Sequence, residues 1–300
     1  MPTKPVRKAV IAAAGFGTRF LPQTKAMPKE MLPLVDKPII QYIVEELVAS
    51  GIEDIVIVTG YHKRSIEDHF DHISADLREN LKSAGKTELL EATKKISGLA
   101  NFAYIRQKGA YGSATPVMNA AHLIGDEPFI YTFADDFIVA KPLRFQQMIN
   151  LYNERGSSVL PCIKIEKDED YNRYGVVAGE QIDDGLIKMS TIIEKPGRAN
   201  APSDMASVSG YLLTPDIFEY IEKSLPLLEP GKELLIQTAM QMMIDDGKEL
   251  LAYQVQNGTF YDTGNKLEYL KTVVDFALMH EDVKDEFAEF LRNKIIQEGV

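Results

Sequence analysis

The first half of the chain alternates short apolar runs with longer amphipathic segments, and this alternation limits the folds open to it. The apolar runs have the length of buried strands, and they are "KAVIAAA" (8–14), "DIVIVTG" (54–60), "FAYIRQ" (102–107), "PFIYTFADD" (128–136) and "SSVLPCIKI" (157–165). The segments with helical character between them are "PIIQYIVEELVASG" (38–51), "SIEDHF" (65–70), "SATPVMNAAHLI" (113–124) and "RFQQMINLYNERG" (144–156). Strands that alternate with helices predict a mainly parallel sheet with right-handed crossovers.

The second half changes character and predicts paired strands beside helices. "YGVVAGEQIDDGLIKMSTIIEKP" (174–196) surrounds an Asp-Asp-Gly turn, which is typical of a hairpin. "MASVSGYLLTP" (205–215) is expected to be one further strand. "LLAYQVQNGTFYDTG" (250–264) is expected to be a hairpin that turns at Asn257-Gly258. The remaining helical segments are "DIFEYIEKS" (216–224), "ELLIQTAMQMMIDDG" (233–247) and residues 266–300.

Together these elements predict an α/β fold. We expect a Rossmann-like mixed, mainly parallel sheet flanked by helices, with inserted β-hairpins and a C-terminal helical segment. A length of 300 residues, 45% of them hydrophobic, suits one large domain or two small ones. We place one domain at 1–265 and C-terminal helices at 266–300, which either pack on that domain or contact another subunit.

Composition narrows the classes of partner. The formal net charge of −11 argues against general nucleic-acid binding, which needs a basic surface. No apolar run approaches the roughly 20 residues of a membrane span. The stretch "MPTKPVRKAVIAAAG" is superficially like a signal peptide, but Arg19 and a Lys/Pro-rich segment follow it, so it is better interpreted as a first strand. The lone Cys162 excludes an internal disulfide and favours the cytoplasm.

The loop after the first strand has the residues of a phosphate site. Gly15 and Gly17 allow close approach of backbone N–H groups, and Arg19, Lys25 and Lys29 add three cations that suit a triphosphate. A dinucleotide fingerprint would need a third glycine at position 20, where the chain has phenylalanine, and the G-x-x-x-x-G-K-[ST] loop is absent. The alternative is a solvated loop whose basic residues are there by chance.

The segment "GFGTRFLPQTKAMPKEMLPLVDKPIIQYIVEE" (15–46) resembles the signature of sugar-1-phosphate nucleotidyltransferases. Within that family it is most similar to the bacterial enzymes that transfer a uridylyl group to glucose 1-phosphate. The resemblance covers nearly the whole chain and continues through "SIEDHF", "RQKG", "GDEPF", "YGVV", "IIEKP", "DTGNKLEYL" and the final helices.

The resemblance implies a reaction in which glucose 1-phosphate attacks the α-phosphorus of UTP, so that UDP-glucose forms and pyrophosphate leaves. The attacking phosphate is already an anion near neutral pH, so no catalytic base is required. The five histidines are scattered, and Cys162 has no histidine near it in sequence. The work is to hold two polyanions in line, for which the resemblance implies Mg²⁺ as cofactor.

The resemblance also assigns the metal and catalytic residues. Asp135 ends a predicted strand, where ligands gather in open α/β sheets, and it is expected to hold Mg²⁺ together with Asp262. A carboxylate pair at a strand end would also suit a turn or a cap. The expected catalytic residues are Arg19, Lys29, Asp135 and Lys195.

Two further groups of residues follow from the resemblance. Gln107 is expected to read the base and Gly112 to let the base lie against the backbone, although a glutamine there could also be a polar strand end. The full nucleotide group is Ala13, Ala14, Gly15, Gly17, Thr18, Glu30, Gln107 and Gly112. The sugar group is Asp136, Gly175, Glu194, Lys195 and Gly210, in which Lys195 would hold the phosphate and Glu194 the hydroxyls.

The chain also departs from the pattern of these enzymes, and some alternatives stay open. It has "AYGSATPV" (110–117) where many of them have "GLGHA", "FAD" (133–135) where they have "LPD", and "AAAG" (12–15) where "PVAG" is usual. Because the first change touches the base pocket, thymidylyl transfer is the nearest alternative. A catalytically weak regulatory paralogue that binds nucleotide sugars is another. The resemblance and the apolar faces of "LEYLKTVVDFALMH" (267–280) and "FAEFLRNKII" (287–296) favour a homo-oligomer, a dimer or a tetramer.

Overall fold

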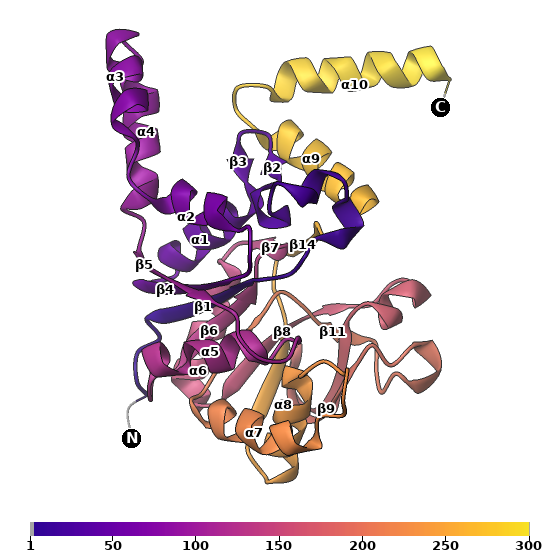
Figure 1. Ribbon diagram of the computed structural model, residues 1–300. Helices are drawn as coiled ribbons and strands as arrows, with labels where there is room; N and C mark the ends of the chain where they lie inside the picture. Colours follow the sequence, from indigo (N-terminus) through magenta and orange to yellow (C-terminus); the bar gives the residue numbers. More distant parts are fainter. Residues whose placement is uncertain (1–2, 300) are drawn as a thin grey trace.

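A mixed sheet of ten strands runs through residues 3–299, the part of the chain that the computed structural model describes (Figure 1). The strand order is β11-β9-β10-β13-β8-β12-β6-β1-β4-β5. The strands are β1 (Lys8–Ala13), β4 (Asp54–Thr59), β5 (Asn101–Arg106), β6 (Phe129–Phe133), β8 (Ser158–Lys164), β9 (Gly175–Asp183), β10 (Leu186–Glu194), β11 (Met205–Ser207), β12 (Tyr211–Leu213) and β13 (Leu250–Gln254). The strands β5, β4, β1 and β6 are parallel, as the first half of the sequence predicts. The predicted hairpin over 174–196 is present as the antiparallel pair β9–β10.

Helices cover both faces of this sheet, because its central strands are apolar on both sides. In β1, Ile11 packs into one apolar cluster and the neighbouring Val10 into the other. The first cluster includes side chains of α1 (Ile39–Ala49), α2 (Arg64–Phe70), α6 (Arg144–Arg155) and α9 (Lys266–Met279). The second includes side chains of α5 (Thr115–Ile124), α7 (Asp216–Ser224) and α8 (Ile236–Asp245). A sheet covered on both faces leaves the strand ends as the place for a site.

Two small sheets lie beside the main one, and one of them corrects the sequence prediction. β2 (Pro33–Leu34) pairs with β3 (Lys37–Pro38), and β7 (Asp136–Ala140) pairs with β14 (Gly258–Asp262). The predicted hairpin over 250–264 is therefore wrong: the chain turns at Asn257, but β13 stays in the main sheet and β14 leaves it. Gly258 permits this, since a Cβ there would stand only 2.7 Å from a methyl group of Ile138 on β7.

The strand predicted over 205–215 is also wrong, because it is broken in the middle. Ser209 and Gly210 both have left-handed backbone conformations, with φ of +60° and +106°. This break separates β11, which pairs with β8 and β9, from β12, which pairs with β6 and β8. The break lies next to the site described below.

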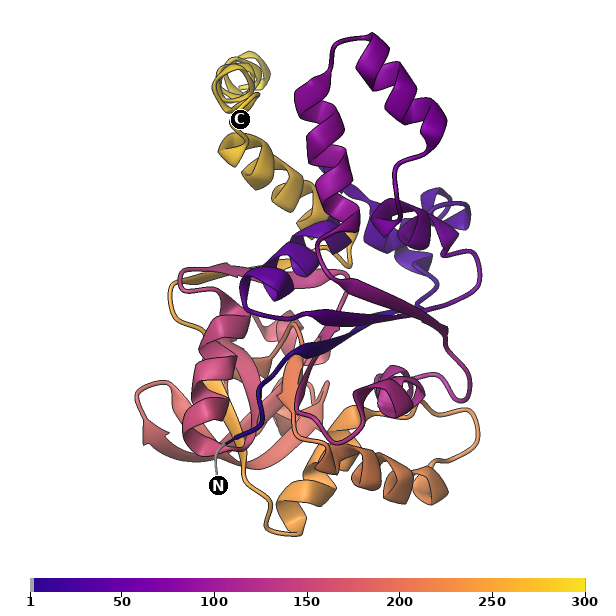
Figure 2. The same cartoon turned by 90° about the vertical axis from the view of Figure 1, so that its left-hand side faces the viewer.

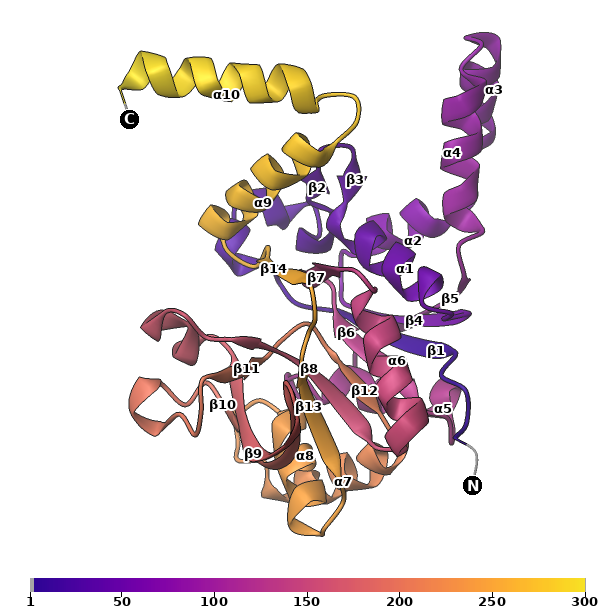
Figure 3. The ribbon, with the colours of Figure 1, turned by 180° about the vertical axis from the view of Figure 1, so that it is seen from behind.

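Some of the helices project from the body of the molecule (Figures 1, 2 and 3). The antiparallel pair α3 (Ala75–Ser83) and α4 (Thr87–Ser97), which was not predicted, forms one arm, and α10 (Lys284–Glu298) forms another. α9 packs on the domain through Phe276, whereas α10 has no buried residue within its described length. Within residues 3–299, none of the helices combines the length and the apolar character needed to cross a bilayer.

Candidate active site

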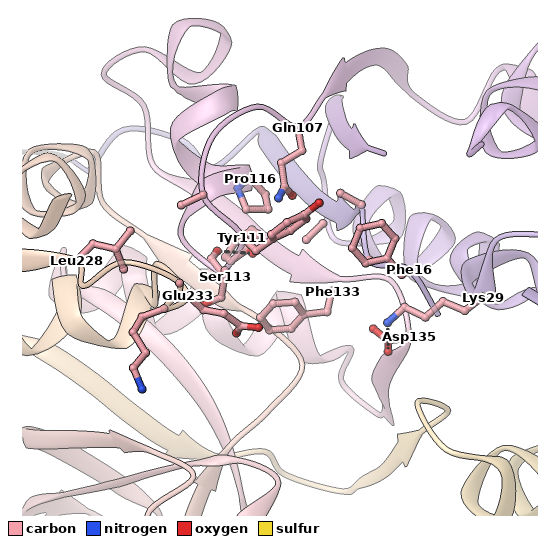
Figure 4. Close-up of a pocket in the computed structure, with 18 of the residues that line it drawn as sticks. Phe16, Lys29, Gln107, Tyr111, Ser113, Pro116, Phe133, Asp135, Leu228 and Glu233 are labelled. Carbon is pink, nitrogen blue, oxygen red and sulfur yellow. Dashed lines mark hydrogen bonds and ion pairs between the residues drawn. The ribbon is translucent and has the colours of Figure 1, made fainter. Parts of the chain in front are cut away.

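Two cavities open beside the carboxyl ends of β1, β5 and β6, and they meet at Asp135. The first has a volume of about 840 Å³ and the second about 650 Å³. Asp135 lines both, as do Ser113, Phe133 and Glu233. Figure 4 shows the first cavity, with Lys29 and Asp135 at one end and Leu228 at the other. A ligand that filled both cavities would therefore pass Asp135 at its middle.

Most of the residues predicted for the site line one of these cavities. Those on the first are Ala14, Gly15, Lys29, Glu30, Gln107 and Gly112. Those on the second are Arg19, Asp136, Gly175, Glu194, Lys195 and Asp262. The predicted nucleotide and sugar groups are thus separated in space, with Asp135 between them.

The cations of the first loop do not gather around one point, although the sequence predicts a common clamp for a triphosphate. Lys29 lines the first cavity and Arg19 the second, where Arg19 Nη1 donates to the carbonyl of Gly264 over 3.2 Å. Lys25 and Thr18 line a separate cavity of about 330 Å³. Successive 3-10 turns at Thr18–Phe20, Gln23–Lys25 and Lys29–Met31 point these side chains in different directions.

Besides Thr18, three of the predicted residues line neither of the two cavities that meet at Asp135. Ala13 is buried within β1. Gly17 has a φ of +65° and its carbonyl accepts from Thr24 Oγ1 over 2.6 Å, so it shapes the loop. At Gly210, a Cβ would stand 2.4 Å from the carbonyl oxygen of Tyr131, so only glycine fits against β6. Direct contact with a ligand stays a prediction for each.

Asp135 is held at the end of β6 by a loop from far along the chain. The backbone N–H of Thr263 and its Oγ1 both donate to the Asp135 carbonyl, over 3.0 Å and 2.6 Å. This brings Asp262 beside Asp135. The two carboxylates flank Gly264, since a Cβ there would stand 2.8 Å from Asp262 Oδ1 and 3.3 Å from Asp135 Oδ2.

Cations neutralise both of these carboxylates. Lys29 forms an ion pair with Asp135, and Arg173 forms one with Asp262. Tyr174 also donates from its hydroxyl to Asp262 over 2.9 Å. Burial alone would lower the pKa of Lys29, but the nearby charges of Asp135 and Glu30 outweigh it, so this pKa is raised and the ammonium stays charged.

Asp136 lies in a different environment from its neighbour. It opposes Asp262 across the β7–β14 pair, and its Oδ2 accepts from the backbone N–H of Ser209 over 3.0 Å. Burial, followed by the charges of Asp135 and Asp262, raises the pKa of Asp136 to about 7. Asp136 is therefore a weaker acid than a surface carboxyl group.

On the first side, two loops shape the wall of the cavity through their backbones. Gln107 follows β5 directly, and its N–H donates to the carbonyl of Thr59 over 2.8 Å. Gly112 has a φ of +136°, and a Cβ there would stand 2.2 Å from the carbonyl oxygen of Leu234. The N–H of Leu234 donates to the carbonyl of Tyr111 over 2.7 Å. Only a glycine at 112 lets these two loops meet.

Glu30 carries a buried charge pair behind the first cavity. Its Oε2 lies 2.6 Å from Nζ of Lys63, and neither side chain is more than 8% exposed. Burial raises the pKa of Glu30 and lowers that of Lys63, and each charge opposes this change in the other group. The pair fixes the Lys29–Met31 turn against α2 and so holds Lys29 in place.

On the second side, Glu194 is the last residue of β10 and Lys195 follows it. Lys195 Nζ lies 3.3 Å from Glu194 Oε1, and Glu194 Oε2 accepts from Gln237 Nε2 over 2.9 Å. The other end of that amide accepts from Ser113 Oγ over 3.3 Å. Gly175 leaves room here, because a Cβ would stand 3.1 Å from Glu194 Oε2. Gln237 therefore links the loop of the first cavity to the carboxylate of the second.

Comparison with known proteins decides the family. The nucleotidyl transferase model matches residues 8–277. The chain belongs to the nucleotidyl transferase family. Among its curated relatives, the UTP–glucose-1-phosphate uridylyltransferase of Bacillus subtilis (strain 168) is 42% identical over 297 residues, which is 99% of this chain and 100% of that protein.

Solved structures of nucleotidyl transferases have the same fold. A UDP-glucose pyrophosphorylase complexed with UDP-glucose is 36% identical, with a TM-score of 0.80 over 92% of this chain and 100% of that one. A UTP-bound enzyme of this kind from Acinetobacter baumannii is 32% identical, with a TM-score of 0.85 over 95% of this chain and 98% of that one. These matches confirm the predicted family and the mixed α/β fold.

The residues of this nucleotidyl transferase fit a divalent metal. Within residues 3–299 no cluster of three or more His, Cys, Asp or Glu side chains is arranged to hold an ion. Mg²⁺, however, is commonly held by one or two carboxylates together with substrate phosphates and water. Asp135 and Asp262 flank one point and supply the oxygen donors that this ion prefers. The donor set therefore suits a metal that arrives with the nucleotide.

Sequence reasoning missed several residues that shape this nucleotidyl transferase site. Arg173, Lys63 and Gln237 pair with Asp262, Glu30 and Glu194. Each lies far along the chain from its partner. Arg173 stands beside the "YGVV" segment, and this position was the one available signal. The other two have none, because an isolated lysine just before a helix or an isolated glutamine on one resembles a surface residue.

Proposed function

We propose that this chain is a UTP–glucose-1-phosphate uridylyltransferase, which joins UTP and glucose 1-phosphate to give UDP-glucose and pyrophosphate. The observation that carries the proposal is the meeting of two cavities at Asp135. One wall offers Gln107 and Gly112 to a base, and the other offers Glu194 and Lys195 to a sugar phosphate. The reacting phosphates would then meet beside Asp135. The names of two curated relatives that are 42% and 43% identical to this chain support the same substrates.

The charges of the site suit the transfer of a nucleotidyl group between two anions. Lys29 remains protonated because carboxylates raise its pKa, so it serves as a fixed positive charge rather than as an acid. Lys195 would hold the phosphate of the sugar, whose oxygen attacks without needing a base. Glu194, held by Gln237, would accept hydrogen bonds from sugar hydroxyls. The residues orient the reactants and offset their repulsion.

Asp135 and Asp262 would hold Mg²⁺. When bound, the ion neutralises phosphate charge and aligns the reacting groups. In the structure, Lys29 forms an ion pair with Asp135 and Arg173 forms one with Asp262. When the carboxylates take the metal, these two cations would exchange their carboxylate partners for phosphate oxygens.

The test is a product matrix. The purified chain is mixed with Mg²⁺, a nucleoside triphosphate and a sugar 1-phosphate, and pyrophosphate release is assayed for each combination. UTP with glucose 1-phosphate should give the fastest release. A preference for dTTP would instead establish thymidylyl transfer. Binding of UTP and UDP-glucose without any turnover would establish a regulatory paralogue.

We further infer a homo-oligomer of the cytoplasm, in which one domain (1–265) is followed by helices (266–300). On α10, Phe290 is 57% exposed and Ile296 is 77% exposed, and a subunit contact would cover such side chains. The free thiol of Cys162 is buried, which suits a reducing compartment. Light scattering tests the assembly, and a monomeric mass would contradict it. Fractionation of the source cells tests the location.

A further inference from the structure

Arg144 is a fully buried arginine that lines neither of the cavities meeting at Asp135. It begins α6, and its exposed fraction is 0%. Nη2 lies 2.9 Å from Glu46 Oε2 on α1, and Nη1 donates to the carbonyl of Ser209 over 2.8 Å. Buried ion pairs are seldom more stabilising than apolar side chains of similar size. A reason other than stability is therefore needed for the charge at this position.

Ser209 supplies that reason, because its backbone is strained and held from several sides. Its φ of +60° is unfavourable for a residue with a Cβ. The carbonyl that accepts from Arg144 also accepts from Thr132 Oγ1 over 3.2 Å. The N–H of Ser209 donates to Asp136 Oδ2 over 3.0 Å. The conformation of Ser209 and the position of Asp136 are therefore fixed together.

These groups form part of the second cavity. Ser207, Ser209 and Asp136 line it, next to the point where the two cavities meet. Four buried polar atoms around this segment have no hydrogen-bond partner among residues 3–299, and they are Arg144 Nε, Asp136 Oδ1, Ser207 Oγ and Ser209 Oγ. Unsatisfied buried polar groups are rare in a structural core. Their concentration here indicates a segment whose conformation serves the cavity rather than the core.

We propose that Arg144 is a positioning residue for the sugar side of the site. Together with Glu46, it fixes the left-handed backbone of Ser209, and through Ser209 it fixes Asp136 and one wall of the second cavity. This inference rests on the proposed function, because it assigns the second cavity to the sugar phosphate. It follows that changes at Arg144 weaken the binding of the sugar and leave that of the nucleotide unchanged.

The central variant is Arg144→Lys, which keeps the charge beside Glu46 but loses the fork that reaches two partners at once. We expect the KM for glucose 1-phosphate to rise about tenfold, the effect of losing one buried hydrogen bond to a charged donor. The KM for UTP should change by less than about twofold. In titration calorimetry, UDP-glucose should bind about tenfold more weakly while UMP binds as before.

Two further variants separate positioning from folding. Thr132→Val removes the second donor to the Ser209 carbonyl with little change of shape, and it should raise the KM for glucose 1-phosphate about threefold. Ile221→Val truncates a buried side chain of α7. It should lower the midpoint of thermal unfolding without changing the ratio of the two KM values. If Arg144→Lys does not fold, Thr132→Val decides by the same ratio.

The proposal would be overturned if Arg144→Lys raised the KM values for UTP and glucose 1-phosphate in parallel, or if the ratio of these two KM values equalled that of Ile221→Val. Arg144 would then be only part of an ion pair in the core. Failure of the proposed function has a different signature. A wild-type chain that binds UDP-glucose but releases no pyrophosphate refutes the function, while the comparison of UDP-glucose with UMP still decides the role of Arg144. A wild-type chain that does not bind UDP-glucose refutes both.

Discussion

The two cavities that meet at Asp135 are built in different ways. The first is formed mainly by loops that follow β1 and β5, and its shape depends on backbone positions such as Gly112. The second is formed by side chains from β7, β10, α8 and β14, which lie far apart in the sequence. Hydrogen bonds from Gln237 and Ser209 hold its carboxylates. A cavity whose shape is set by the backbone tolerates changes in the surrounding side chains. A cavity whose wall is made of side chains depends on the hydrogen-bond partner of each one.

Asp135 belongs to both cavities, so a change there should damage the reaction as a whole. Asp135→Asn keeps the shape but removes the charge that would hold Mg²⁺. We expect kcat to fall about a thousandfold or more, because metal and charge stabilisation supply several kcal/mol to such transfers. Steady-state kinetics at saturating substrates measures this fall. The matched control is Asp184→Asn in the exposed turn between β9 and β10. Activity above a tenth of wild type would exclude the assigned metal site.

The next largest effect is expected on the sugar side alone. Lys195→Met removes the ammonium that would meet the sugar phosphate. A charge-assisted contact of this kind contributes about 1.5–3 kcal/mol, so the KM for glucose 1-phosphate should rise roughly 10- to 100-fold. The KM for UTP should stay within about twofold. Lys188→Met, at an exposed position of β10, the strand that ends just before Lys195, is the control. Equal increases in the KM values for UTP and glucose 1-phosphate would show that the two substrates do not bind in separate cavities.

A change in the first cavity, on the nucleotide side, should raise the KM for UTP and not that for glucose 1-phosphate. Gln107→Leu removes a donor and an acceptor from the wall of the first cavity. Because one or two hydrogen bonds to a base are lost, we expect the KM for UTP to rise about tenfold, with the KM for glucose 1-phosphate nearly unchanged. The nucleotide preference should also relax, which a panel of triphosphates would reveal. Unchanged preference would place the base elsewhere.

The same contrast explains what the sequence could predict. The parallel strands and the α/β class follow from local patterns, such as the apolar run that leads to Asp135, and the loop after the first strand pointed to Gly15 and Lys29. Gln107 and Gly112 on the first cavity were implied only by the resemblance to a known family. The break at Ser209 was missed, because the apolar pattern of 205–215 continues across it without interruption. Long-range hydrogen bonds determine the backbone conformation at Ser209. The false hairpin at Asn257 has the same cause. Its turn signal was right, but the partner of β14 is β7, across more than a hundred residues of chain.

The basic loop after β1, which contains Arg19, Lys25 and Lys29, could also be predicted only in part. The sequence shows that these three cations lie within one short segment, but their spacing does not show in which direction each side chain points. Three 3-10 turns send the side chains toward different cavities. Gln237, which lines the second cavity, and Arg144, which is buried behind it, have no local sequence signal, because their roles depend on partners that the fold brings to them.

The smallest effect should come from the exposed rim of the first cavity, where Phe16 and Tyr111 are in contact, with ring centroids 5.5 Å apart. Both side chains are more than half exposed, at 68% and 62%, so Tyr111→Leu should leave the free energy of unfolding unchanged. A bound base would cover these rings and gain an aromatic contact of about 0.5–1.5 kcal/mol. The variant should therefore raise the KM for UTP about two- to tenfold and leave glucose 1-phosphate binding unaffected. Phe290→Leu, an equally exposed aromatic on α10, should change neither KM. A Tyr111→Leu enzyme that loses affinity for the sugar phosphate instead would show that the rim closes over both cavities, and the division at Asp135 would then fail.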